Sequence, residues 1–260
     1  MRKLTPDNMD RAHKGGGRKN GINLIISAAL DLIYPRVYCE LCGSPLEKSA
    51  HSGFCGTCHA SLPFIAGPRC HKCGKPLKTE ADRLCPDCFS IEHAFEAGLP
   101  VFEYIEPVRG LVHRYKYDRE YHLGRSLAYF MAELYRASGW KAQIAIPVPL
   151  HKNKLKTRGF NQALLLAEYL AHKCRIACLD GVLVRRVDTG TQTRLSRRER
   201  EENLRDAFHV VKPSKIAGKD ILLIDDIYTT GATVDNCSKA LKNAGAGAVY
   251  VLTLATGRNI

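Results

Sequence analysis

The most constraining stretch of this sequence lies between residues 221 and 233. It opens with four apolar residues, continues through Asp225 and Asp226, and ends in a loop of threonine, glycine and alanine. An unbroken apolar run is typical of a strand that is buried on both faces of a parallel sheet. The pattern after the loop is helical and stops at Gly245. The sequence therefore predicts an α/β fold in which the acids stand where the strand ends.

The loop has the chemistry of an anion site. Gly231 lets the backbone approach a ligand closely, and the first N–H groups of the helix and the threonine hydroxyls are donors for a phosphate. Asp225 and Asp226 would instead accept hydrogen bonds from vicinal hydroxyls, so the pairing predicts a sugar phosphate. The alternative is an ordinary turn with a threonine cap. The residues expected to hold the phosphate are Thr229, Thr230, Gly231, Ala232 and Thr233.

This stretch resembles the phosphoribosyl pyrophosphate (PRPP) motif of type I phosphoribosyltransferases. In that family the apolar strand, the acidic pair and the Thr-Thr-Gly-x-Thr loop bind ribose 5-phosphate. The resemblance implies a mostly parallel sheet of about five strands with helices on both faces. It also implies Mg²⁺, which bridges the pyrophosphate and the ribose hydroxyls, and it places Asp225 and Asp226 at the catalytic centre.

A second candidate anion site follows a second predicted strand at 143–150. The loop after this strand, 151–158, is basic, and a helix opens beyond it. Because ligands of open α/β sheets bind at the carboxyl ends of the strands, this loop should face the first one. We expect Lys154, Arg158 and Gly159 to bind the pyrophosphate.

Eight of the eleven cysteines form four Cys-x-x-Cys pairs between positions 39 and 88. Thiolates at this spacing reach one Zn²⁺, and two pairs complete a tetrahedral site. The first and third pairs share the repeat Cys-x-x-Cys-Gly-x-Pro-Leu, which favours sequential sites over cross-braced ones; disulfides or redox pairs are the alternative. We expect two structural zinc ions in a double ribbon, one held by Cys39, Cys42, Cys55 and Cys58 and the other by Cys70, Cys73, Cys85 and Cys88.

The net charge indicates which kind of partner the chain binds, and the hydropathy indicates whether it crosses a membrane. The net charge of +13 at pH 7 favours an anionic partner such as a nucleotide, nucleic acid or anionic lipid. No apolar run reaches the ~18–20 residues that cross a bilayer, so we expect a cytoplasmic chain that is not transmembrane. The predicted domains are a basic disordered tail at 1–21, a helix plus double zinc ribbon at 22–92, and a phosphoribosyltransferase-like domain at 93–260.

Two segments have features of nucleic-acid binding. Basic residues alternate with tyrosines at 113–121, a mix that stacks on bases and neutralises a single strand. An amphipathic helix with a solvated basic face explains the same pattern equally well. The arginine-rich segment at 182–210 predicts a flexible hood over the edge of the sheet.

Further motifs narrow the resemblance. Residues 147–150 read Pro-Val-Pro-Leu, and residues 158–162 read Arg-Gly-Phe-Asn-Gln. With the zinc ribbon, the PRPP motif and a spaced pattern in the hood, the chain resembles the ComF family (the ComFC/GntX group) over residues 22–256. The hood pattern consists of Thr189, Gln192, Leu195, Arg200, Asn203 and Phe208.

The ComF resemblance implies a competence factor that binds PRPP and handles incoming single-stranded DNA at the inner face of the membrane. Proteins of the competence machinery are the implied partners. One alternative is an active PRPP-dependent phosphoribosyltransferase of nucleotide salvage or synthesis, and another is a zinc adaptor with a vestigial pocket. The motif leaves open whether phosphoribosyl transfer is catalysed and which base accepts it.

Overall fold

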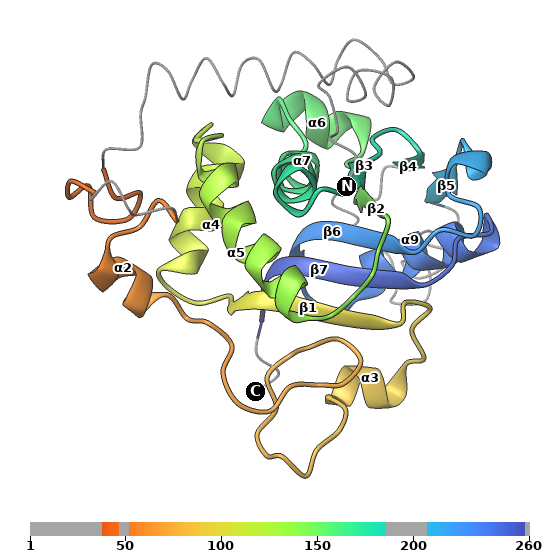
Figure 1. Cartoon of the computed structure of the whole chain (residues 1–260), viewed down its shortest axis with the longest axis horizontal. Coiled ribbons are helices and arrows are strands. Elements are labelled where there is room, and N and C mark those ends of the chain that lie inside the picture. Colours follow the sequence, from red (N-terminus) through yellow and green to blue (C-terminus); the bar gives the residue numbers. More distant parts are fainter. Residues whose placement is uncertain (1–37, 47–51, 186–206, 258–260) are drawn as a thin grey trace, which may run out of the picture.

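The computed structural model describes residues 38–46, 52–185 and 207–257 (Figure 1). The basic tail predicted at 1–21, the helix predicted after it and most of the arginine-rich hood lie outside these residues. None of the helices within the described ranges combines the length and the apolar character needed to cross a membrane.

A parallel sheet forms the centre of the molecule (Figure 1). Each of its neighbouring strands runs parallel to the next, which confirms the predicted α/β class. Its five strands lie in the order β1 (Ala97–Glu103), β7 (Val249–Thr256), β6 (Ile221–Tyr228), β2 (Ile144–Pro147) and β3 (Ala177–Cys178).

Both faces of the sheet are covered, as the apolar run predicts. Successive side chains of a strand point to opposite faces, so Leu222 and Ile224 enter one core while Ile221 and Leu223 enter the other. The first core is closed by helices α4 (Val108–Tyr117), α5 (Leu123–Ala137) and α7 (Gln162–Cys174). The second core is closed by α9 (Ala232–Asn243).

The central strand β6 is longer than the sequence predicts. Its pairing with β7 continues past the two acids, through Asp225 opposite Thr253, to Tyr228 opposite Thr256. The acids therefore lie within the last residues of strand β6 rather than after its end. The apolar run marks the part of the strand that is buried on both faces, whereas hydrogen bonding carries the strand further.

The segment 151–158, predicted as a loop, contains the short helix α6 (Lys152–Arg158). Its N-cap is His151, whose side chain accepts a hydrogen bond from the Asn153 N–H at 3.3 Å. Gly159 ends the helix in the left-handed conformation at φ 80°, which glycine adopts without strain. Lysine, leucine and arginine inside the segment are all good helix formers.

The two zinc ribbons pack on opposite faces of the sheet. The first ribbon, with helix α2 (Gly56–Ser61), places Cys39, Phe54 and Leu62 in the core that contains α5. The second ribbon, with helix α3 (Pro86–Ser90), places its four cysteines in the core that contains α9. Each ribbon thus shares a hydrophobic core with a different face of the sheet.

A small antiparallel pair, β4 (Leu183–Arg185) and β5 (Phe208–Val210), brackets the undescribed part of the hood. A turn of 3₁₀-helix, η2 (Pro213–Lys215), connects β5 to the central strand β6.

Candidate functional site

The strand order places a topological switch point between β2 and β6, and the region at the carboxyl ends of these two strands is here called the crevice. From β2 the chain runs through α7 to β3 on one side, and from β6 it runs through α9 to β7 on the other. The segments that leave these two neighbouring parallel strands therefore diverge at their carboxyl ends. Such a switch point is where open α/β sheets bind ligands. Both anion sites predicted from the sequence follow these two strands.

The acidic pair lies on the crevice edge of β6. The Asp226 N–H donates to the Asp225 carboxylate at 2.8 Å, and the Asp226 carboxylate forms an ion pair with Lys116 Nζ at 2.9 Å. Desolvation and the adjacent charge of Asp226 raise the pKa of Asp225 from its usual 3.8 to about 7, although the Asp226 N–H, Lys116 and Arg158 act in the opposite direction. Asp225 consequently holds a proton for much of the time near neutral pH.

Lys116 belongs to this site, although the sequence pattern at 113–121 indicates a nucleic-acid contact for it. It lies in the last turn of helix α4, and its side chain is 12% exposed beside the 15% exposed Asp226. Its neighbour Tyr115 is fully buried and donates its hydroxyl to the Gln162 carbonyl at 2.9 Å, which fixes the helix end. Residues 113–117 of the interleaved pattern thus form the end of an amphipathic helix, with Tyr117 exposed, and residues 118–121 follow outside the helix.

The loop at residues 229–233, here called the phosphate loop after its expected ligand, joins β6 to α9. Gly231 has φ 85° and caps the helix, and its carbonyl accepts the first helical hydrogen bond from the Asp235 N–H at 2.8 Å. Thr229 and Thr230 are exposed, while Ala232 and Thr233 are half-buried in the first turn. The first N–H groups of an α-helix have no partner within the helix, so this turn supplies the donors that an anion site requires.

Of the two charged residues among the three predicted pyrophosphate ligands, Arg158 is the one whose charge acts on Asp225. Its guanidinium donates to the Gln162 side chain at 3.1 Å and to the Tyr117 hydroxyl at 3.2 Å, and it helps to lower the pKa of Asp225. Gly159 follows it at the end of α6. Lys154 lies on the exposed surface of the same helix.

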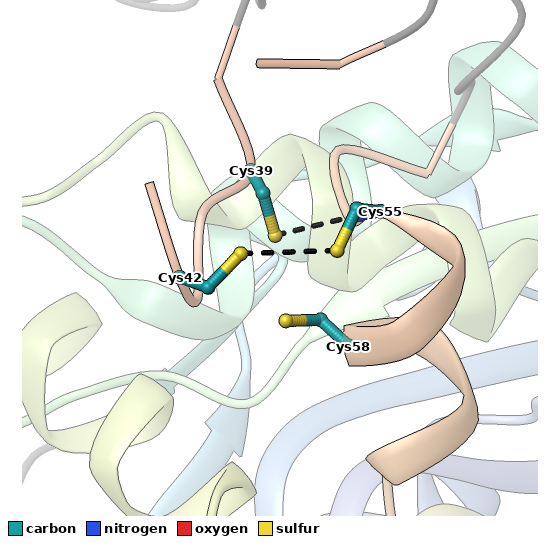
Figure 2. A group of neighbouring side chains, drawn as sticks. All are labelled: Cys39, Cys42, Cys55 and Cys58. Carbon is teal, nitrogen blue, oxygen red and sulfur yellow. Dashed lines mark hydrogen bonds between the residues drawn. The ribbon is translucent and has the colours of Figure 1, made fainter. Parts of the chain in front are cut away.

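The eight cysteines form two sequential groups, as predicted from the repeat. Within each group the sulfur atoms lie within 4.8 Å of one another (Figure 2 shows the first group). In a tetrahedral site with Zn–S bonds of about 2.3 Å, sulfur atoms are about 3.8 Å apart. Cys42 and Cys55 are 3.8 Å apart and Cys73 and Cys85 are 3.6 Å apart, so both groups fit Zn²⁺.

Both groups also support their sulfur atoms in the same way. The Cys55 N–H donates to the Cys39 sulfur at 3.4 Å, and the Cys85 N–H donates to the Cys70 sulfur at 3.3 Å. None of the eleven cysteines forms a disulfide in this structure, which disfavours the disulfide alternative. Four thiolates close each zinc site, so a zinc ion there would be structural.

Comparisons with known proteins agree with this architecture. Residues 29–89 match the double zinc ribbon domain, and residues 155–259 match the phosphoribosyl transferase domain. Competence protein F of Haemophilus influenzae is 31% identical over 212 residues, covering 79% of this chain and 91% of that protein. The chain belongs to the ComF family.

Two other ComF relatives extend the match to most of the chain. DNA utilization protein YhgH of Salmonella typhimurium is 31% identical over 83% of this chain and 95% of its own length. Competence protein ComFC of Streptococcus pneumoniae is 29% identical over 83% of this chain and 98% of its own length. The relatives therefore share both the ribbon and the sheet domain with this chain.

A second group of buried residues in this ComF chain was not predicted from the sequence. Beneath the phosphate loop, His93 and Tyr228 are buried, and Asp235 is buried in the first turn of α9. Burial opposes the charge of Asp235, but contacts with His93, Lys239 and the Ala94 N–H outweigh it and lower the pKa of Asp235 to about 2. The one local signal was an acid in the first turn of a helix, which is also an ordinary stabilising feature.

Proposed function

We propose that this protein is a competence factor of DNA uptake that binds PRPP with Mg²⁺ in the crevice and binds single-stranded DNA. The observation that carries the proposal is the grouping of two carboxylates, two cations and an anion loop at one switch point. Lys116 pairs with Asp226 at 2.9 Å, and Lys116 and Arg158 are the two cations that act on Asp225. A ligand with both hydroxyls and phosphates matches this arrangement.

In the proposed complex, the 5′-phosphate of PRPP accepts hydrogen bonds from the phosphate loop, and the ribose hydroxyls donate to Asp225 and Asp226. Arg158, Gly159 and Lys154 receive the pyrophosphate. Mg²⁺ bound together with PRPP would supply further positive charge at this site. Lys116 forms an ion pair with Asp226 in the free protein. Ligand binding therefore replaces that ion pair with new hydrogen bonds from the ribose to Asp226.

The names of the relatives support the role in DNA uptake. They are called competence proteins and DNA utilization proteins, and the match covers nearly their whole length. The net charge of +13 suits a polyanion. We place the protein in the cytoplasm, at the inner face of the membrane, where other proteins of the competence machinery would be its partners.

An active phosphoribosyltransferase is the second candidate. Arg158 beside the acidic pair favours it, because a guanidinium there would neutralise the departing pyrophosphate while a base attacks the anomeric carbon. Such catalysis needs mainly positioning and charge stabilisation from the protein. Pyrophosphate release from PRPP in the presence of single bases would distinguish this candidate from a protein that only binds PRPP.

The PRPP site is tested by replacing Asp226 with alanine. Loss of hydrogen bonds to a charged carboxylate, each worth ~1.5–3 kcal/mol, should weaken PRPP binding at least about tenfold. The measurement is calorimetric titration with PRPP and Mg²⁺. Glu133→Ala is the matched control, because this acid forms an exposed ion pair with Arg136 on α5. Equal affinities of Asp226→Ala and wild type would remove the acids from the site.

DNA binding is tested by the fluorescence anisotropy of a labelled single-stranded oligonucleotide. Its log affinity should fall linearly with log salt, by ~0.7 for each phosphate contact, because bound DNA releases counterions. Since Arg158 and Lys154 would serve both ligands, PRPP with Mg²⁺ should compete with the oligonucleotide. Binding that ignores PRPP would move the DNA site away from the crevice, and no binding at low salt would remove the DNA role.

A further inference from the structure

The second zinc ribbon meets the phosphate loop through one buried side chain. Tyr228, the last residue of β6, is 2% exposed and lies between the two. On the ribbon side, the Nζ atom of Lys75 lies 5.5 Å from the centre of the Tyr228 ring. On the loop side, the Tyr228 hydroxyl fills the position that a Cβ atom on Gly231 would occupy. One ring therefore contacts both the ribbon and the loop.

A second connection runs through the residues that follow the ribbon. The buried His93 ring stacks on Phe95, with ring centres 4.9 Å apart, and its Cε1 atom lies 3.2 Å from the position of a Cβ atom on Gly231. The Ala94 N–H donates to the Asp235 carboxylate at 2.7 Å. Because Asp235 lies in the first turn of α9, this hydrogen bond fixes the helix start that forms the phosphate loop.

Packing, rather than hydrogen bonding, holds the two rings in place. Among the described residues, neither the Tyr228 hydroxyl nor either ring nitrogen of His93 has a hydrogen-bond partner. The His93 Nδ1 atom lies 3.5 Å from the Asp235 carboxylate, at the outer limit of a hydrogen bond, so packing supplies most of the support for these two rings. They are held by neighbours such as Lys75, which is itself fixed by an ion pair with Asp87 at 2.7 Å inside the ribbon. If the ribbon unfolds, that support is lost.

The first ribbon has a different neighbour. Its Glu40 accepts a hydrogen bond from Ser126 of α5 at 2.6 Å, and its Phe54 contacts Phe130 of the same helix with ring centres 5.8 Å apart. Both contacts belong to the opposite face of the sheet. The end of α4 that carries Lys116 contacts this ribbon too, because Arg114 donates to the Glu40 carbonyl at 2.9 Å, but the buried Tyr115 also fixes it from the side of α7. Unfolding of the first ribbon would leave the phosphate loop supported.

We propose that the second zinc ribbon holds the phosphate loop in its binding conformation, with Tyr228 and His93 as the positioning residues. Zinc in the second ribbon is then required for ligand binding in the crevice, and zinc in the first ribbon is not. The inference rests on the proposed function, because it concerns the same anion site. Coupling between two binding sites is reciprocal, so a phosphate ligand must also tighten zinc binding in the second ribbon.

The test compares two variants of the full chain at equivalent positions of the repeat, Cys85→Ser in the second ribbon and Cys55→Ser in the first. Elemental analysis should find two zinc ions in wild type and one in each variant. Ribose 5-phosphate is the probe, because it would contact only the acids and the phosphate loop. Cys85→Ser should bind it at least about tenfold more weakly, and Cys55→Ser within about twofold of wild type.

The reciprocal measurement distinguishes coupling from general unfolding. In Cys55→Ser the remaining zinc belongs to the second ribbon, and its equilibrium with a competing chelator should shift about tenfold toward bound zinc when ribose 5-phosphate is added. In Cys85→Ser the remaining zinc belongs to the first ribbon, and its equilibrium should not move. Equal behaviour of the two variants would overturn the inference.

A variant that keeps both zinc ions tests the contact itself. Tyr228→Leu removes the ring between the ribbon and the loop, and it should retain two zinc ions while binding ribose 5-phosphate at least about tenfold more weakly. Unchanged affinity would overturn the positioning role of Tyr228. Failure of wild type to bind ribose 5-phosphate or PRPP would instead overturn the proposed function, and this inference with it.

Discussion

Replacing Gly231 with alanine is expected to abolish PRPP binding and to lower the free energy of unfolding by about 2–5 kcal/mol. Two costs add up in this variant. A left-handed backbone costs a non-glycine residue roughly 1–2 kcal/mol, and Gly231 has φ 85°. The new methyl group would also overlap the Tyr228 hydroxyl, whose ring is buried and has no room to move away. The loop and the start of α9 must therefore shift.

Gly245→Ala is the matched control for this variant. Gly245 has nearly the same backbone conformation, φ 86°, but no heavy atom lies within 4 Å of the position of its Cβ atom. The control carries the backbone cost without the overlap, so it should be more stable than Gly231→Ala by about 1–3 kcal/mol and bind PRPP normally. Urea denaturation and calorimetric titration measure the two effects. Similar losses in both variants would show that the packing beneath the phosphate loop is unimportant.

The features that the sequence predicted well are those with a local cause. The apolar run at 221–224 indicated a doubly covered strand because burial on both faces leaves no polar position. The spacing of the cysteines indicated zinc ribbons because two thiolates must meet one ion. Because both motifs follow predicted parallel strands, the acids and the basic segment were expected together at the carboxyl ends of those strands. Each of these inferences needed only neighbouring residues.

The features that could not be predicted from the sequence depend on contacts between segments that are far apart in the chain. Lys116 meets Asp226 across 110 positions of the chain, and nothing in its own neighbourhood distinguishes it from a solvated lysine. The two ribbons have nearly the same motif but pack on opposite faces of the sheet, because the residues around the motif differ. Phe54 inserts beside α5 from the first ribbon, whereas Lys75 covers Tyr228 from the second.

Asp225→Asn is expected to stabilise the protein at pH 8 and to have a smaller effect at lower pH. The pKa of Asp225 is raised from 3.8 to about 7 in the folded protein. Between these values the folded state holds a proton that the unfolded state has lost, so the free energy of unfolding falls as pH rises and is lowest above pH 7. Asparagine never ionises, and its side-chain oxygen can still accept the hydrogen bond from the Asp226 N–H.

The size of the effect follows from the same shift. Each pKa unit corresponds to about 1.4 kcal/mol, so the gain of Asp225→Asn at pH 8 should approach about 2–4 kcal/mol, the lower figure allowing for partial exposure. Urea denaturation of wild type and variant between pH 5.5 and 8.5 measures it, and the difference cancels the contribution of the zinc sites. A constant difference across this range would contradict the raised pKa.

The neighbouring acid provides the control with the opposite sign. Asp226→Asn breaks the ion pair with Lys116, and both side chains of that pair are at most 15% exposed. Removing one partner of a largely buried pair leaves the other charge without compensation, which destabilises a protein. Two adjacent carboxylates should therefore respond to the same substitution in opposite directions at pH 8. A loss of stability in both variants would mean that Asp225 is ionised and paired in the free protein, and that the crevice holds more positive charge than Lys116 and Arg158 supply.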